Sequence, residues 1–194
     1  ADAGEEFENW LGSELAAGAG RRFLKEILTG TGTNGFRGIG SQVAAAHSKA
    51  TAGALGTQVE GDLTWCTGRL ERAEIASEGA VWVLHPFVRD FLAGVQSPAG
   101  TFFYRESLDN RRLHGREVFV TSGADPTKIT LAEPSFLLGV AGTPDVLAGE
   151  GVLVDGQLLS AHAIGARVIR MTMRCGLALT RNVAAAEITG FSLT

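Results

Sequence analysis

The chain has 194 residues, 45% of them hydrophobic, which is enough for one large domain or two small ones with a real core. Its net charge of -4 excludes a global basic field for nucleic acid, so any contact with DNA has to be local. The sequence shows no membrane-length apolar run, no signal pattern, and no metal-site or disulfide spacing at Cys66 and Cys175. We therefore expect a soluble, cytoplasmic, globular protein with ordinary thiols.

A long amphipathic helix is predicted over residues 5–28. Apolar residues recur there every four positions, at Phe7, Leu11, Leu15, Ala19, Phe23 and Ile27. Acidic side chains lie early and basic ones late, as the helix dipole favours. Each internal glycine costs about 1 kcal/mol relative to alanine, so we expect close packing or a bend at Gly12, Gly18 and Gly20.

The segment after this helix carries the spacing G-x-G-x-x-G at Gly30, Gly32 and Gly35. In a dinucleotide site this spacing follows a strand and opens a helix, whereas here it follows a helix and precedes a stretch rich in alanine and glycine. We interpret these glycines as turn residues that supply positive φ. A small α/β enzyme that binds a nucleotide through residues 30–35 is an alternative interpretation.

Residues 40–61 are predicted to be irregular, with His47 and Lys49 in solvent. Asp62 is a candidate N-cap residue for the next helix. One face of that helix is apolar and carries Leu63, Cys66, Leu70 and Ala73. The helix leads into the segment around which the rest of the chain is organised.

That segment starts with residues 80–84, an unbroken apolar run typical of a strand in the middle of a sheet, covered on both faces. His85 and Pro86 end the strand, and proline favours the first position of a helix. The predicted apolar face of this helix contains Phe87, Phe91, Leu92 and Val95.

A turn and a second strand follow the helix. Proline and glycine in residues 96–100 indicate the turn. Alternation from Leu113 onward places Val118 and Val120 on one face of a strand and Phe119 on the other. We interpret the arginine-rich part of residues 104–116 as a solvated loop, with a subunit contact as the alternative. Its basic residues are Arg105, Arg111, Arg112 and Arg116.

The rest of the chain is predicted to consist mainly of strands. Residues 128–140 favour a strand or hairpin, in which Pro134 indicates an edge or a bulge. Asp155 and Gly156 form a strong turn signal for a hairpin between two apolar runs. Further strands are expected at residues 167–173, 176–180 and 184–189.

The order of these elements resembles the core of tailed-bacteriophage major capsid proteins, whose fold is named after phage Hong Kong ninety-seven. A strand ending in His-Pro, a helix, a glycine turn and the Leu-x-Gly segment at 113–115 follow one another as in that family. The long helix with its Gly-x-Gly-Thr turn at 30–33 and the ending RCGLALTRNVAAAEITGF are similar to the family as well. These matches cover most of the chain.

The resemblance implies an α+β fold with a long spine helix, a peripheral lobe and an axial lobe. It assigns residues 1–29 and 128–173 to the peripheral lobe, and residues 30–127 and 174–194 to the axial lobe. The implied function is that of a major capsid subunit, which self-assembles into pentamers and hexamers of an icosahedral shell enclosing phage DNA. An encapsulin-like compartment, which encloses cargo proteins, is an alternative with the same fold.

The resemblance also implies partners and a location. Copies of the chain are the main partners, joined by scaffold, maturation protease, portal and decoration proteins and by packaged DNA held non-specifically. No membrane is involved, and the virion is assembled in the bacterial host cytoplasm. Because the family's N-terminal arm and extended loop precede the spine helix, where this sequence begins, we expect the chain expressed alone to form monomers or small rings.

No catalytic, cofactor-binding or metal-binding residue is predicted. None of the histidines, His47, His85, His114 and His162, lies in a hydrolase or zinc motif. We interpret His85 as bonding to local backbone before the helix that Pro86 opens. Some family members cross-link subunits through a lysine, an asparagine and a glutamate. The corresponding strand here carries Arg167, Arg170, Arg174 and Cys175, so we do not expect this cross-link.

Overall fold

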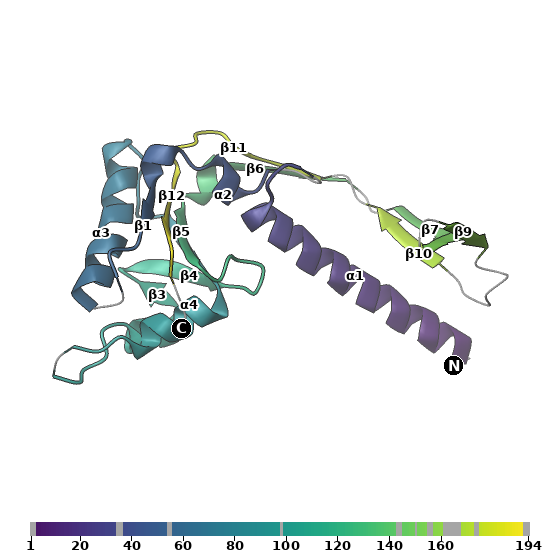
Figure 1. The fold of residues 1–194 in the computed structure, drawn as a ribbon, viewed down its shortest axis with the longest axis horizontal. Helices are drawn as coiled ribbons and strands as arrows, with labels where there is room; N and C mark the ends of the chain where they lie inside the picture. The colour runs from purple at the N-terminus through teal and green to yellow at the C-terminus, as the bar shows by residue number, and fades with distance from the viewer. Residues whose placement is uncertain are drawn as a thin grey trace. The chain divides into compact units, whose positions relative to one another are not determined.

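The computed structural model describes residues 3–33, 37–53, 56–97, 99–142, 145–149, 151–154, 157–160, 168–172 and 175–191 (Figure 1). The chain divides into two compact units, Ala1–Gly20 with Val140–Gly176, and Arg21–Gly139 with Leu177–Thr194. The lobe assignment with its boundaries at 29, 127 and 173 remains a prediction. None of the described helices is both long and apolar enough to cross a lipid bilayer.

Helix α1 (Ala3–Thr29) confirms the long helix predicted near the N-terminus. Its side chains become half-buried from Phe23 onward, apart from the exposed Lys25. The close packing expected at its glycines is absent at Gly18 and Gly20, because a Cβ atom there would meet no described atom within 4 Å. These two glycines therefore cost helix stability without allowing a neighbour to approach.

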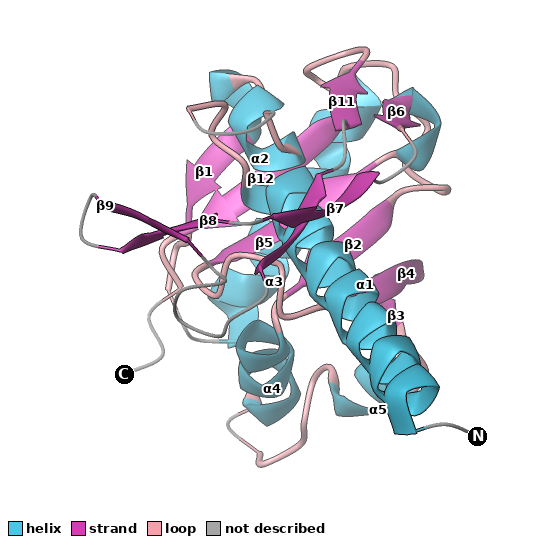
Figure 2. Cartoon of the chain, turned by 90° about the vertical axis from the view of Figure 1, so that its right-hand side faces the viewer, coloured by secondary structure: helices cyan, strands magenta, loops and turns pink. Residues whose placement is uncertain are grey.

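A six-stranded mixed sheet, drawn with magenta arrows in Figure 2, forms the centre of the second unit. Its order is β1 (Ser48–Ala50), β12 (Ala185–Thr189), β5 (Lys128–Ala132), β2 (Val81–Leu84), β4 (Arg116–Val120) and β3 (Arg112–Leu113). The pairs β1–β12 and β2–β4 are parallel, and the others are antiparallel. The predicted mid-sheet location of β2 is confirmed, since β5 and β4 flank it.

The main core lies on one face of this sheet. Strand residues Trp82, Leu84, Ile129, Leu131 and Ile188 are fully buried there. They share a cluster with the apolar face predicted for α3 (Gly56–Arg72), from which Leu63, Cys66 and Leu70 are also fully buried. On the opposite face the β2 side chains are half-buried, so the predicted cover on both faces is complete on the core face and partial on the other.

Helix α4 (Pro86–Gly94) begins where the His-Pro pair predicted. The predicted apolar face is correct at Phe91, Leu92 and Val95 but wrong at Phe87, which is 60% exposed. Val88 and Leu92 are fully buried and Val95 nearly so. Val88, Leu92 and Val95 have the spacing i, i+4 and i+7, which is as regular a helical pattern as the predicted one. Packing against the sheet determines that these three residues face the core. The turn after α4 is confirmed by the bridge between Gln96 and Phe102.

Shorter elements complete the two units. These are α2 (Ile39–Gln42), η1 (Ala45–His47), α5 (Arg105–Asp109), η2 (Pro134–Phe136), β6 (Leu137–Ala141), β7 (Asp145–Gly149), β8 (Gly151–Val154), β9 (Gln157–Ser160), β10 (Val168–Thr172) and β11 (Cys175–Leu179). The pairing of β8 with β9 confirms the hairpin predicted around residues 155–156, which themselves lie outside the described residues. Strands β10, β11 and β12 confirm the three closing strands.

Two local predictions need correction. Pro134 opens the short helix η2 between β5 and β6, because the Glu133 carboxylate accepts a hydrogen bond from the Ser135 amide and caps that turn. The arginine-rich segment is not one solvated loop, since Arg105 begins α5. Arg116 lies in β4, and its guanidinium donates to the Ser77 carbonyl over 2.6 Å.

Gly38 allows the chain to pass closely over the end of α1. A Cβ atom at Gly38 would lie 2.6 Å from both the Glu26 carbonyl oxygen and the Gly30 nitrogen. Gly38→Ala is therefore expected to lower the free energy of unfolding by about 2 kcal/mol in urea denaturation. In the control Gly61→Ala, inside α3 and with no described atom within 4 Å, we expect a gain of about 1 kcal/mol. Equal effects of both changes would contradict this explanation.

Candidate functional site: a charged pocket at the end of the long helix

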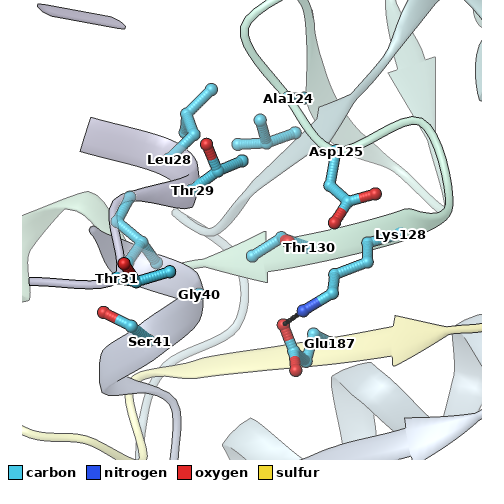
Figure 3. Close-up of a pocket in the computed structure, with 12 residues that line it drawn as sticks. Leu28, Thr29, Thr31, Gly40, Ser41, Ala124, Asp125, Lys128, Thr130 and Glu187 are labelled. Atoms are coloured by element: carbon cyan, nitrogen blue, oxygen red, sulfur yellow. Dashed lines mark hydrogen bonds and ion pairs between the residues drawn. The ribbon is translucent and has the colours of Figure 1, made fainter. Parts of the chain in front are cut away.

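A pocket of about 260 Å³ lies between the end of α1, the helix α2 and the half-buried face of the central sheet (Figure 3). Its apolar lining includes Leu28, Ile39 and Val83. Its polar lining consists of Thr29, Thr31, Ser41, Asp125, Lys128, Thr130 and Glu187. Alternation along β5 places Lys128 and Thr130 on this face and Ile129 and Leu131 on the core face.

The charged side chains that line the pocket form an ion pair and hydrogen bonds within the protein. The buried carboxylate of Glu187 accepts a hydrogen bond from the Ser48 hydroxyl over 2.8 Å, and the Lys128 ammonium lies 3.4 Å from it. Burial alone would raise the pKa of Asp125, but hydrogen bonds from the Thr127 hydroxyl and amide and the charge of Lys128 lower it. The lowered pKa of Asp125 favours its ionised form, and its hydrogen bonds make it part of the packing.

The chemistry of this pocket favours a structural role. Its carboxylates and its ammonium compensate each other, and its volume is below the usual range of ligand pockets, about 300 to 1,000 Å³. Among the described residues, no three His, Cys, Asp or Glu side chains gather as metal ligands. The sequence analysis named none of these pocket residues. The alternation of polar and apolar residues over 128–132 was the signal that could have identified this face.

The prediction that the glycines beside the pocket supply positive φ is confirmed at Gly32 and wrong at Gly30. Gly30 donates its amide to the Glu26 carbonyl, and Gly32 has a φ of +85°. Gly35 lies outside the described residues. Because a helix precedes Gly30 and the following α2 has only four residues, no strand-to-helix turn is present here for a pyrophosphate.

We expect calorimetry with ATP or NAD at millimolar concentration to give no heat of binding. The reason is that the amide of Gly30 is already used inside the helix end, so it cannot bind a phosphate. A micromolar dissociation constant that Gly32→Val abolishes would contradict this expectation.

Asp62 and Lys49 form an ion pair that the sequence analysis missed. Helix α3 begins at Gly56, so Asp62 lies inside it and is not a cap. Its fully buried carboxylate accepts from the Lys49 ammonium over 2.7 Å, the Thr51 hydroxyl over 2.9 Å and the Ala52 amide over 2.8 Å. The pair ties the edge strand β1 to α3, and the prediction of a solvated Lys49 is wrong.

The three histidines among the described residues are either buried or close to a hydrogen-bonding partner within the protein. His85 accepts a hydrogen bond from the Phe87 amide at Nδ1, which confirms its predicted backbone bond. His47 is buried rather than solvated, and burial and the charge of Arg69 lower its pKa. His114 lies 3.1 Å from the Glu60 carboxylate. His162 lies outside the described residues.

Two other ionisable groups are held in unreactive states. Burial raises the pKa of the Cys66 thiol, which keeps this free cysteine protonated and confirms that it is an ordinary buried thiol. Burial and the hydrogen bond to Glu60 likewise raise the pKa of the Tyr104 hydroxyl.

Large apolar side chains remain exposed elsewhere on the chain. Leu138 and Val140 on β6 are 59% and 64% exposed, and their spacing of two places them on the same face of that strand. Phe119 on β4 is 47% exposed and lies on the face opposite the buried Val118, as the predicted alternation requires. Neighbouring exposed apolar residues of this kind are typical of surfaces that contact other proteins.

The sequence model of the phage capsid family matches residues 1–189. The chain belongs to the phage capsid family. This membership confirms the resemblance identified from the sequence, and it makes the chain a structural protein of the capsid type. No curated protein matches the sequence.

Solved structures show that this capsid-family chain has the fold of tailed-phage capsid proteins. The capsid protein of Mycobacterium phage Bobi aligns with a TM-score of 0.70 and 13% identity, covering 94% of this chain and 65% of the other. The chain from Microbacterium phage Oxtober96 aligns with a TM-score of 0.69 and 15% identity, covering 97% of this chain and 66% of the other. The capsid of an empty GTA particle aligns with a TM-score of 0.67 and 16% identity, covering 95% of this chain and 66% of the other.

An encapsulin also shares this fold at a lower level of similarity. The SrpI encapsulin of Synechococcus elongatus aligns with a TM-score of 0.53 and 15% identity, covering 88% of this chain and 61% of the other. The capsid-family chain thus spans just under two thirds of the length of the solved structures named here. The α+β capsid fold expected from the sequence is confirmed.

Proposed function

We propose that this chain is a major capsid subunit, which packs with copies of itself into pentamers and hexamers of a closed icosahedral shell around phage DNA. The observation that carries the proposal is the family match over residues 1–189. The subunit acts by packing and not by catalysis. Scaffold, maturation protease, portal and decoration proteins, and assembly in the host cytoplasm, belong to the same proposal.

The architecture of the chain supports this role. The second unit holds its edge strand β1 and its helix α3 together through the ion pair of Lys49 with the buried Asp62, so it can serve as a rigid building block. The exposed apolar pair on β6, Leu138 and Val140, offers a surface for a neighbouring copy. In this proposal residues 1–29 and 128–173 form the peripheral lobe, and residues 30–127 and 174–194 form the axial lobe.

Sedimentation velocity over a range of concentrations, followed by electron microscopy of the heavier fractions, tests self-assembly. We expect rings of five or six copies whose fraction rises with concentration. The double change Leu138→Ser and Val140→Ser should reduce that fraction, because it removes exposed apolar contact area. The control changes the exposed pair Arg89 and Asp90 on α4 to serine and should leave the fraction unchanged. A chain that stays monomeric at millimolar concentration would contradict the proposal.

An encapsulin-like compartment is the second candidate, favoured by the structural similarity to the SrpI encapsulin. The two functions differ in what the shell contains. Particles purified from cells should show the ultraviolet absorbance of nucleic acid if the chain encloses DNA. A particle with a protein cargo and no nucleic acid would support the encapsulin alternative instead.

A further inference from the structure

Three basic side chains gather on the last turns of α1. Arg21, Arg22 and Lys25 are exposed and line an open hollow of about 540 Å³ together with the loop residues Thr121, Ser122 and Gly123. At about 100° per residue, the three basic positions fall within an arc of about 100° on one side of the helix. They span about 6 Å along its axis, at a rise of about 1.5 Å per residue. The three charges therefore point to one region of solvent.

The loop beside these residues is held close to the helix. A Cβ atom at Gly123 would lie 3.2 Å from the backbone nitrogen of Lys25, so the glycine allows the loop backbone to contact α1. The Thr121 hydroxyl accepts from the Gly123 amide and stabilises this conformation. As a result, the hydroxyl-bearing residue Ser122 is placed beside the basic side chains without further rearrangement.

The charges of this cluster are weakly compensated. Glu26 is the one acidic residue among those lining the hollow, and none of the three basic side chains forms an ion pair with a carboxylate in the described part of the chain. The arginines near α5 are different, since Arg112 faces Glu117 across the β3–β4 pair and Glu106 and Asp109 lie in α5 itself. The α1 cluster is thus a local excess of positive charge on a chain of net charge -4.

We propose that the cluster of Arg21, Arg22 and Lys25 binds the phosphate backbone of duplex DNA without regard to sequence. Guanidinium groups bind phosphate oxygens through two parallel hydrogen bonds, and hydroxyl groups beside them are common phosphate donors. A span of about 6 Å covers roughly two base-pair steps of about 3.4 Å each. This inference rests on the proposed function, because a closed shell presents many copies of a weak site to the same DNA.

Fluorescence anisotropy of a labelled DNA duplex, titrated with the full chain at several salt concentrations, tests the proposal. Each phosphate neutralised contributes about -0.9 to the slope of log affinity against log salt, so three basic side chains give about -2.7. The triple variant Arg21→Gln, Arg22→Gln, Lys25→Gln is expected to bind at least about tenfold more weakly at about 50 mM salt and to lose most of that slope.

The matched control is the triple variant Arg105→Gln, Arg111→Gln, Arg112→Gln, which removes the same charge and should bind like the parent. Unchanged binding by the α1 variant, or an equal loss in the control, overturns the proposal. Tighter binding to a poly-glutamate peptide than to the duplex overturns it as well, because the cluster then fits an acidic protein surface. Sedimentation of the α1 variant separates the two proposals, since rings should still form if only the DNA contact is lost.

Discussion

Replacing Trp82 by alanine is expected to lower the free energy of unfolding by about 3 to 5 kcal/mol. Trp82 is fully buried in β2, with Val118 of β4 and Leu131 of β5 as its cross-strand neighbours. Its indole nitrogen donates to the Leu113 carbonyl over 2.9 Å. The change leaves a cavity in the middle of the sheet and a buried carbonyl without its donor. This loss is a large part of the stability of an ordinary domain.

Chemical denaturation of two variants separates the cavity from the hydrogen bond. Trp82→Phe keeps an aromatic ring but removes the donor, so we expect a loss of about 1 to 2 kcal/mol. Trp82→Ala loses both contributions and should be clearly less stable than the phenylalanine variant. A denaturation midpoint within error of the parent for Trp82→Ala shows that this residue does not belong to the core.

Replacing Asp62 by alanine is expected to cost about 3 kcal/mol of unfolding free energy. The change leaves the Lys49 ammonium, the Thr51 hydroxyl and the Ala52 amide without their common acceptor. The figure is at the low end for a buried ion pair, because the Lys49 side chain is 36% exposed and water can solvate its charge.

Two comparison variants test whether the burial of Asp62 causes the expected loss of unfolding free energy. Asp62→Asn keeps an oxygen for Thr51 and Ala52 but removes the charge, so its loss should be smaller than that of Asp62→Ala. Asp90→Ala removes the acidic partner of Arg89 on the surface of α4, and there we expect less than about 1 kcal/mol. Similar losses for Asp62→Ala and Asp90→Ala would mean that burial does not strengthen the Lys49–Asp62 pair.

Features set by local chemistry could be predicted from the sequence. The four-residue spacing over residues 5–28, the His85–Pro86 boundary and the hairpin signal between β8 and β9 all act within a few residues. The structure confirms the long helix, the start of α4 and the pairing of β8 with β9. The family resemblance added the overall fold, because it compares the order of many such local signals at once.

Features set by distant partners could not be predicted. Asp62 was interpreted as the cap of the apolar helix that follows it. Its partner Lys49 reaches it only when β1 pairs with β12, far along the chain. Likewise, the pattern in α4 allows either Phe87 or Val88 to face the core, and packing on the sheet decides in favour of Val88. The pocket around Glu187 was missed for the same reason, since α1, α2, β5 and β12 all contribute to it.

The position of β12 determines when the central sheet can be completed during synthesis on the ribosome. This strand is the last of the described strands in sequence order and lies inside the sheet, between β1 and β5. Ser48 and Glu187, hydrogen-bonded in the finished sheet, are separated by 139 positions of sequence. A growing chain without residues 185–189 leaves β1 unpaired and β5 with one free edge. The sheet is therefore completed only after residue 189 has left the ribosome.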